Sequence, residues 1–328
     1  MKRRDFMALF GGIPAVWSAN LFAQQPQETG RIALLMALTE SDPEGAACAK
    51  AFRRGLQELR WEEGLNLQID IRWASGNTQK QHAAELLAIA PKVAVAHGTP
   101  AVLAFKNRVP TLPIVFVQVA DPVQQGIVPN LSHPGGNITG FMGFEFTIAG
   151  KWLQILKKAA PQVARVAIMF NPTTAPYYRS YVQEAELAAA PLDIQVVPMA
   201  MHEPAQIQEG MAQIGKDGNY GLLIIPDTFT LSNRDLLVNS TNQHRVPAIF
   251  PYKFYALSGG MISYGIDVAD LFYRAASYVD RVLRGESPGN LPVQAPTKFQ
   301  LIFNQKAIKS LGLALPPDLL AQADEVIE

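Results

Sequence analysis

The sequence predicts an α/β fold of two similar lobes, and three observations support this prediction. The chain has 328 residues, enough for about two domains of roughly 150 residues each. After residue 30, short apolar runs alternate with amphipathic stretches, a pattern typical of parallel strands joined by crossover helices. Arg31 and Arg165 stand 134 residues apart, and so do the similar segments 112–116 and 246–250. This shared offset indicates that one structural unit occurs twice.

The expected elements follow in chain order. The strands of the first lobe are residues 32–38, 67–73, 93–96, 114–117 and 138–141. Those of the second lobe are residues 166–170, 194–198, 222–225, 248–250 and 261–264. Glycines between 135 and 150 supply loose backbone, so we expect the chain to cross first from one lobe to the other near residues 141–150.

The C-terminal part does not fit two complete lobes placed one after the other. Residues 267–284 have one apolar face and precede Gly285, which predicts a helix and its stop. An extended segment at 288–296, a strand at 299–303 and short helices at 307–311 and 317–323 follow. We therefore expect the chain to return to the first lobe and cross again. The predicted lobes are residues 24–142 with 266–296, and residues 143–265 with 297–328.

Composition excludes several classes of protein. Lysine and arginine number 28, as do aspartate and glutamate, so no basic surplus favours nucleic acid as a partner. The one cysteine, Cys48, cannot form an internal disulfide, and we expect it to be buried. The five histidines are scattered without ligand spacing, so we expect no metal and no cofactor.

The N-terminal segment predicts export. Basic residues at positions 2–4 precede an apolar run at 6–17 and a cleavage site after Ala23, as in a signal peptide. Arg3 and Arg4 also fit the twin-arginine pattern, so the route, general secretory or twin-arginine, stays open. The run is shorter than the roughly 20 residues that span a bilayer, and no later run is longer. We expect a soluble protein in the periplasm, without membrane insertion of the mature chain.

Known catalytic motifs are absent from the sequence. No Gly-x-Ser-x-Gly nucleophile turn occurs, and the glycines at 135–140 precede a strand instead of following one. Residues 210–216 have the spacing of a P-loop. The next residue is Asp217, whereas a P-loop has a serine or threonine there, whose hydroxyl reaches magnesium. We therefore do not expect an enzyme.

Polar residues follow the carboxyl ends of the predicted strands. They are Thr39, Gly98, Thr99 and Asp121 in the first lobe, and Asn171, Asp227, Thr228 and Tyr252 in the second. Ligands of open α/β sheets bind outside these ends, although each residue taken singly also suits a helix cap. Because both lobes show the pattern, we expect two half-sites that face each other.

Several segments resemble a known family. They are residues 113–123, 131–140, 262–267, 275–281, 291–299 and 319–327. In these the chain resembles the substrate-binding proteins of ABC importers, of the tryptophan/tyrosine-type group. The resemblance implies a type I periplasmic-binding fold, with two doubly wound α/β lobes joined by three crossing segments. It also implies that the lobes close on a small molecule, an amino acid or aromatic compound, and deliver it to a permease driven by a separate ATPase. The oligomeric state stays open, and we expect a monomer because it suits a carrier that docks one lobe on each half of the permease.

The resemblance also assigns roles to residues. Thr99 and the backbone at Gly98 would hold an anionic group, and Asp121 or Asp227 would pair with an ammonium. Asn171 and Thr228 would add hydrogen bonds, and Tyr252, Tyr264 or Phe141 would stack on the ligand. Asp267 is either a contact or a helix cap.

Two further expectations remain open. The first alternative function is a ligand sensor on the same fold. The second, which we favour less, is an enzyme that uses the cleft. We also expect Asp227→Ala to weaken binding more than folding.

Overall fold

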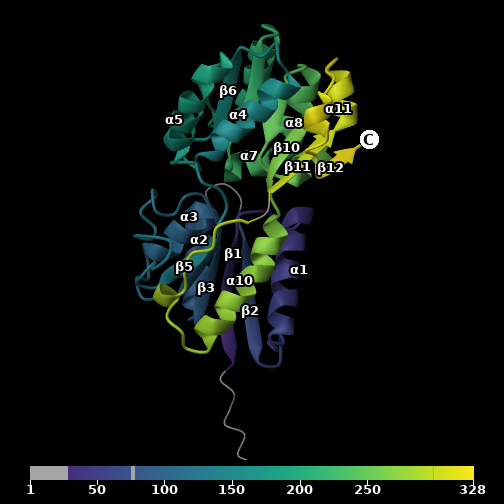
Figure 1. Cartoon of the computed structure of the whole chain (residues 1–328). Helices are drawn as coiled ribbons and strands as arrows, with labels where there is room; N and C mark the ends of the chain where they lie inside the picture. The colour runs from purple at the N-terminus through teal and green to yellow at the C-terminus, as the bar shows by residue number, and fades with distance from the viewer. Residues whose placement is uncertain (1–28, 75–77, 298) are drawn as a thin grey trace, which may run out of the picture.

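Two α/β lobes lie one above the other (Figure 1). The computed structural model describes residues 29–74, 78–297 and 299–328. The predicted export signal and its cleavage site after Ala23 lie outside the described residues.

The first lobe is built on a five-stranded parallel sheet with the order β2-β1-β3-β4-β5. Its strands are β1 (Gly30–Met36), β2 (Leu67–Trp73), β3 (Val93–His97), β4 (Ile114–Val119) and β5 (Ile138–Met142). The connecting helices are α1 (Pro43–Glu58), α2 (Gln79–Ala88) and α3 (Gly98–Lys106). All five residues of β3 are buried, as expected of a central strand covered on both faces.

The second lobe repeats this order in β7-β6-β8-β9-β10 and adds two strands at one edge. Its strands are β6 (Arg165–Phe170), β7 (Gln195–Ala200), β8 (Tyr220–Ile224), β9 (Ala248–Phe250), β10 (Ile262–Ile266), β11 (Phe299–Asn304) and β12 (Glu325–Ile327). Strand β11 runs antiparallel to β10, whereas β12, which the sequence did not predict, is parallel to β11. The predicted helix at 317–323 stops at residue 320.

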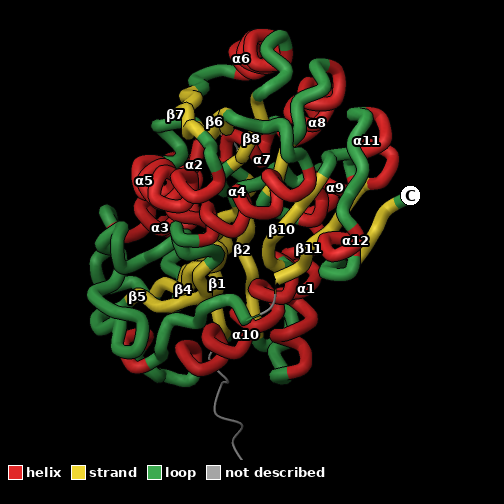
Figure 2. The backbone as a smooth tube through the Cα atoms, turned by 45° about the horizontal axis from the view of Figure 1, so that its top comes forward, coloured by secondary structure: helices red, strands yellow, loops and turns green. Residues whose placement is uncertain are grey.

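Helices cover the sheets of both lobes (Figure 2). Those of the second lobe are α4 (Ile148–Ala159), α5 (Tyr178–Ala189), α6 (Pro204–Gly215), α7 (Thr228–Ser232), α8 (Arg234–Gln243), α9 (Lys253–Leu257), α11 (Gln305–Ser310) and α12 (Pro317–Leu320). In the described parts of the chain, no helix is long and apolar enough to cross a membrane.

Helix α10 (Val268–Leu283) returns the chain to the first lobe, where it lies beside α1 (Figure 1). The two helices approach closely at Gly55, where a Cβ would lie 2.6 Å from the carbonyl oxygen of Tyr273. The indole nitrogen of Trp61 also donates to the Asp280 carboxylate over 2.7 Å. One 3-10 turn, Pro288–Asn290, interrupts the segment that we predicted to be extended throughout.

The segments that connect the lobes form hydrogen bonds and close backbone contacts. The Met142 N–H donates to the Gln294 carbonyl over 2.9 Å, which pairs the first crossing with the last. At Gly265, near the end of β10 that leads to the middle crossing, a Cβ would lie 1.7 Å from the Pro251 carbonyl oxygen, so this position requires glycine. The predicted lobe boundaries, 24–142 with 266–296 and 143–265 with 297–328, remain a proposal.

Candidate ligand-binding cavity between the lobes

A cavity lies between the two lobes, at the carboxyl ends of their parallel strands. Its empty space is about 430 Å³, including the part that opens to solvent. Gly98, Thr99 and Gln118 line it from the first lobe, and Asp227, Thr228 and Tyr252 line it from the second.

Two threonine hydroxyls face this cavity from opposite lobes. Thr99 lies at the start of α3 and is 3% exposed, and Thr228 opens α7. Both hydroxyl oxygens are buried, and within the part of the chain that the structure describes neither has a hydrogen-bond partner. An unsatisfied buried polar group costs about 1–3 kcal/mol, and a hydrogen bond from a ligand to either hydroxyl would remove this cost.

In the wall from the first lobe, His97 forms hydrogen bonds with two other lining residues, Ala37 and Gln118. Its Nδ1 accepts a hydrogen bond from the Ala37 N–H over 3.3 Å, so Nε2 carries the proton and donates to the Gln118 side-chain oxygen. Burial lowers the pKa of His97 to about 4, which makes the ring neutral at pH 7. The start of α3 follows directly. Among the described residues, no side chain caps that helix, so its first N–H groups are available to an anion.

The wall from the second lobe contains a carboxylate that is already hydrogen bonded. Asp227 caps α7 by accepting from the Phe229 N–H over 3.0 Å, and it also accepts from the Asn171 N–H over 2.8 Å and from the Thr174 hydroxyl over 2.5 Å. Burial raises the pKa of Asp227 to about 6, and these three hydrogen bonds oppose the rise. We therefore expect substitution of Asp227 to weaken folding as well as binding, and the expectation that binding suffers more stays a prediction.

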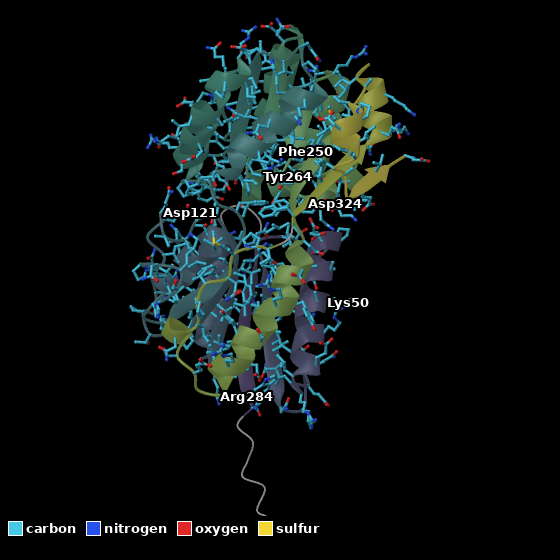
Figure 3. All side chains as sticks on the ribbon, in the orientation of Figure 1. Lys50, Asp121, Phe250, Tyr264, Arg284 and Asp324 are labelled. Carbon is cyan, nitrogen blue, oxygen red and sulfur yellow. The ribbon has the colours of Figure 1, made fainter. Side chains whose placement is uncertain are left out.

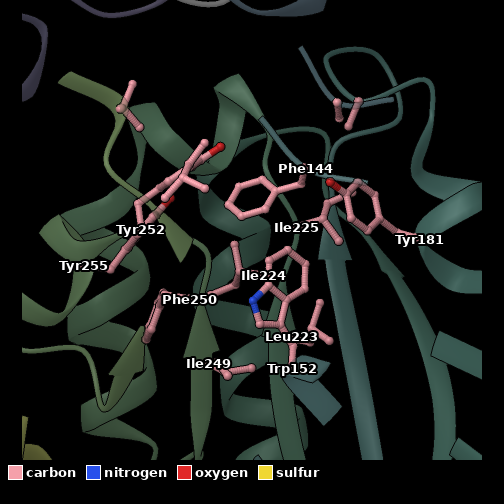
Figure 4. Close-up of a cluster of buried hydrophobic side chains, with 14 of the residues drawn as sticks. Phe144, Trp152, Tyr181, Leu223, Ile224, Ile225, Ile249, Phe250, Tyr252 and Tyr255 are labelled. Carbon is pink, nitrogen blue, oxygen red and sulfur yellow. The ribbon is translucent and has the colours of Figure 1, made fainter. Parts of the chain in front are cut away.

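Aromatic rings form the remainder of the second-lobe wall. The rings of Phe144 and Tyr252 lie 5.6 Å apart, and both line the cavity with Tyr177. Phe144 lies between Tyr252 and Tyr181 at the edge of the hydrophobic core (Figure 4). The Tyr177 hydroxyl donates to the Pro226 carbonyl over 2.8 Å, which fixes the position of its ring. This wall can pack against an apolar or aromatic group.

Direct contacts hold the two lobes together across the cavity. The Arg234 guanidinium, at the start of α8, donates to the Asp42 carboxylate over 2.7 Å, with side chains 15% and 11% exposed. Burial raises the pKa of Tyr252 well above its ordinary value, and a hydrogen bond with the Gln118 side chain partly offsets this. Both interactions join the first lobe to the second, so the protein is in a closed arrangement.

Three of the predicted strand-end residues lie outside this cavity. Thr39 is exposed, and its hydroxyl lies 3.4 Å from that of Ser41. Asp121 lies at the edge of the first lobe that faces the second, but its carboxylate accepts from the Gln124 N–H (Figure 3). Asn171 shapes its own loop, because its side-chain oxygen accepts from the Thr173 N–H over 2.8 Å. These three side chains serve local turns.

Phe141, Tyr264 and Asp267 also lie away from the cavity. The Phe141 ring packs on Tyr278 of α10 at 4.8 Å, and the Tyr264 ring stacks on Phe299 at 5.6 Å. The Asp267 carboxylate accepts from the Asp270 N–H over 3.1 Å, so it is the cap of α10. In this arrangement none of the three is positioned to contact a ligand in the cavity.

The sequence reasoning missed His97, Gln118, Phe144 and Tyr177 as lining residues. His97 is the last residue of a strand and carried a usable signal, because a buried histidine beside a Gly-Thr turn is unusual. Gln118 lies inside β4 with a φ of 62°, and this local turn of the backbone aims its side chain at the cavity. No pattern in the sequence marks that turn.

A family model and a known protein each match most of this chain. The family model described as "ABC transporter substrate binding protein" matches residues 36–327. The tyrosine-binding protein of Clostridioides difficile (strain R20291) is 25% identical over 267 residues, which cover 80% of this chain and 76% of that protein.

Solved structures are similar over nearly the whole chain. A conserved domain protein from Vibrio cholerae superposes with a TM-score of 0.84 at 28% identity, covering 91% of this chain and 99% of that one. An ABC domain from Streptococcus pneumonia in complex with L-Trp superposes with a TM-score of 0.79 at 22% identity, covering 90% and 100%.

Proposed function

This chain belongs to the ABC transporter substrate binding protein family, and we propose that it captures an aromatic amino acid or a related aromatic compound between its lobes. Its fold is the type I periplasmic-binding fold that the sequence predicts. Members of the family bind substrates and are not enzymes. The observation that carries the proposal is the pair of unpartnered hydroxyls, Thr99 and Thr228, which face one cavity from opposite lobes.

The walls of the cavity suit the three parts of such a ligand. The uncapped start of α3, with Gly98 and Thr99, favours the carboxylate because free N–H groups and the helix dipole attract negative charge. Asp227 offers the ammonium its one remaining acceptor position, since three are occupied. Phe144 and Tyr252 pack against the ring. The names of the relatives, with tyrosine and L-Trp as ligands, agree with this chemistry.

Binding and closure are coupled in this proposal. A ligand stabilises the closed arrangement only by contacting both lobes, which the two threonine hydroxyls allow. The closed protein then delivers the ligand to a permease that a separate ATPase drives. The family is typically extracytoplasmic, and the N-terminal sequence supports export to the periplasm.

A ligand screen by thermal unfolding tests the proposal. Residues 24–328 are heated with L-tryptophan, L-tyrosine, L-phenylalanine, L-leucine, L-glutamate or no ligand. An aromatic amino acid at 100 times its dissociation constant adds about 2.7 kcal/mol to the free energy of unfolding. Because valine has nearly the shape of threonine, the Thr99→Val, Thr228→Val double variant is the matched control, and it loses most of this shift. If no aromatic amino acid raises the melting temperature, the proposed ligand class is wrong.

A further inference from the structure

A second cavity lies beside the first between the same two lobes. Its empty space is about 1080 Å³, including the part open to solvent, and Thr99 and Pro100 line both cavities. Thr173 and Thr174 line it from the second lobe, so an occupant would again contact both lobes. The proposed function accounts for the first cavity and leaves this one unassigned.

A buried amide in this second cavity has no partner. Gln79, the first residue of α2, is 5% exposed and lines the cavity. Among the residues that the structure describes, none accepts a hydrogen bond from its Nε2. A buried donor without an acceptor is unfavourable, so a ligand group that accepts this hydrogen bond would remove an existing penalty.

The polar and charged residues around Gln79 indicate which kind of ligand group would bind there. Lys80 and Asn107 line the same cavity from the first lobe, and the described lining residues include no carboxylate. The amides supply both donors and acceptors, whereas Lys80 supplies donors only and a positive charge. The Thr174 hydroxyl already donates to Asp227, so Thr173 is the freer hydroxyl on the opposite wall. Such a lining favours an anionic group rich in acceptors.

We propose that the second cavity is a subsite for a carboxylate carried on an extension of the ligand. Because Thr99 lies between the cavities, the extension leaves the group held at α3 and ends near Gln79 and Lys80. The ligand class then reaches beyond free amino acids to compounds such as a dipeptide with an N-terminal aromatic residue. This inference rests on the proposed function, which positions the aromatic part in the first cavity.

Three related ligands test the subsite by calorimetry on residues 24–328. They are L-tryptophan, tryptophyl-glycine and glycyl-tryptophan. Tryptophyl-glycine replaces the carboxylate at α3 with a neutral peptide carbonyl and gains a carboxylate beyond Thr99. If the subsite offsets the lost charge at α3, this dipeptide binds at least as tightly as tryptophan. Glycyl-tryptophan has the same composition but extends the ammonium end, so we expect it to bind at least about 10-fold more weakly.

A matched pair of variants tests the role of the amide. Gln79→Met keeps the length of the side chain and removes the donor, so the preference for tryptophyl-glycine over tryptophan falls about 5- to 10-fold. Removing an unpartnered buried amide does not weaken folding, and the melting temperature checks this. Gln81→Met is the same change two residues further along α2, on an exposed side chain, and it leaves the preference unchanged.

The outcomes separate the two proposals. If tryptophan binds and tryptophyl-glycine does not, the subsite is wrong and the proposed function stands. The subsite is also wrong if Gln79→Met leaves the preference unchanged. If only tryptophyl-glycine binds, the subsite is supported and the proposed free amino acid is replaced by the dipeptide. If neither compound binds, both proposals fail.

Discussion

The two turns that face each other across the first cavity are similar in sequence position but differ in charge. Each follows a parallel strand, opens a helix and presents a threonine hydroxyl without a partner. The turn at Gly98 leaves its first N–H groups free of any side-chain cap from the described residues, whereas the turn at Asp227 is capped by its own carboxylate. One wall therefore offers hydrogen-bond donors and the other a carboxylate. This difference orients a ligand that carries one charge of each sign.

The two walls also differ in how much of their chemistry supports folding. Asp227 holds the Asn171 N–H, the Phe229 N–H and the Thr174 hydroxyl, so the second-lobe wall depends on it. Thr99 holds nothing in the described structure. A residue type at a strand end thus does not by itself distinguish a binding group from a structural one.

The largest expected effect is on the stability of the second lobe. Asp227→Ala leaves three donors without their acceptor and removes a helix cap, so it lowers the free energy of unfolding by about 3 to 5 kcal/mol. Thr99→Val stays within about 1 kcal/mol of the wild type, because that hydroxyl has no bond to lose. Urea unfolding followed by circular dichroism measures both. Equal losses in the two variants would contradict the difference between the walls.

The next effect is a pH dependence of opposite sign in the two walls. Burial raises the pKa of Asp227 from 3.8 to about 6, so its contribution to stability is full below pH 4 and is lost as pH rises to about 6. Burial lowers the pKa of His97 from 6.5 to about 4, so its contribution is full above about pH 6.5 and is lost as pH falls to about 4. Each change amounts to about 3 kcal/mol, and in the wild type they largely cancel.

Single variants separate these contributions. In His97→Gln only Asp227 remains, and the free energy of unfolding falls as pH rises from 4 to 6. In Asp227→Asn only His97 remains, and the free energy rises from pH 4 to 6.5. Urea titrations at each pH measure both slopes, and the double variant supplies the baseline from all other groups. Slopes of the same sign would show that one of the two groups is not buried as the structure places it.

Hydrophobic periodicity predicted the fold because buried parallel strands are apolar on both faces. Strands β2 and β9 have the predicted bounds, and the return of α10 followed from an unpaired helix after the second lobe. Strand β12 was missed, since it has three residues and its side chains are exposed or only half-buried. Its pairing with β11 depends on tertiary structure that a three-residue segment does not encode.

The strand-end pattern predicted the candidate site only in part. Gly98, Thr99, Asp227, Thr228 and Tyr252 line the first cavity, as the strand-end pattern suggested. Thr39, Asp121 and Asn171 satisfy the same pattern, but their side chains bond within their own loops. Local bonding competes with ligand binding at such positions, and a sequence does not show which one prevails. Whether the lining residues bind the ligand stays a prediction.

The third effect is on binding, and it compares the two hydroxyls directly. Thr99→Val removes a hydroxyl beside the free N–H groups of α3, where the ligand's charged carboxylate is proposed to lie. We expect about a 10-fold loss of affinity for the aromatic ligand, because hydrogen bonds to charged groups are the stronger ones. Thr228→Val removes a hydroxyl from the wall where the Asp227 carboxylate is proposed to bind the ammonium, and since that carboxylate remains, the loss is about 3-fold. Calorimetry measures both, and a larger loss for Thr228→Val would reverse the proposed orientation.

The smallest effect concerns the contact that brings the two turns together. Arg234 and Asp42 form an ion pair between the lobes, and neither residue lines the first cavity. Arg234→Met removes the charge and keeps much of the side chain, whereas substitution of Asp42 would also remove the cap of α1. We expect the free protein to open more often and the affinity for the ligand to fall about 5-fold, corresponding to about 1 kcal/mol. Small-angle scattering of the free protein and calorimetry measure these two changes. Arg179→Met, on an exposed arginine of the same lobe, is the control. If both variants match the wild type in radius of gyration and affinity, the ligand alone holds the two walls together.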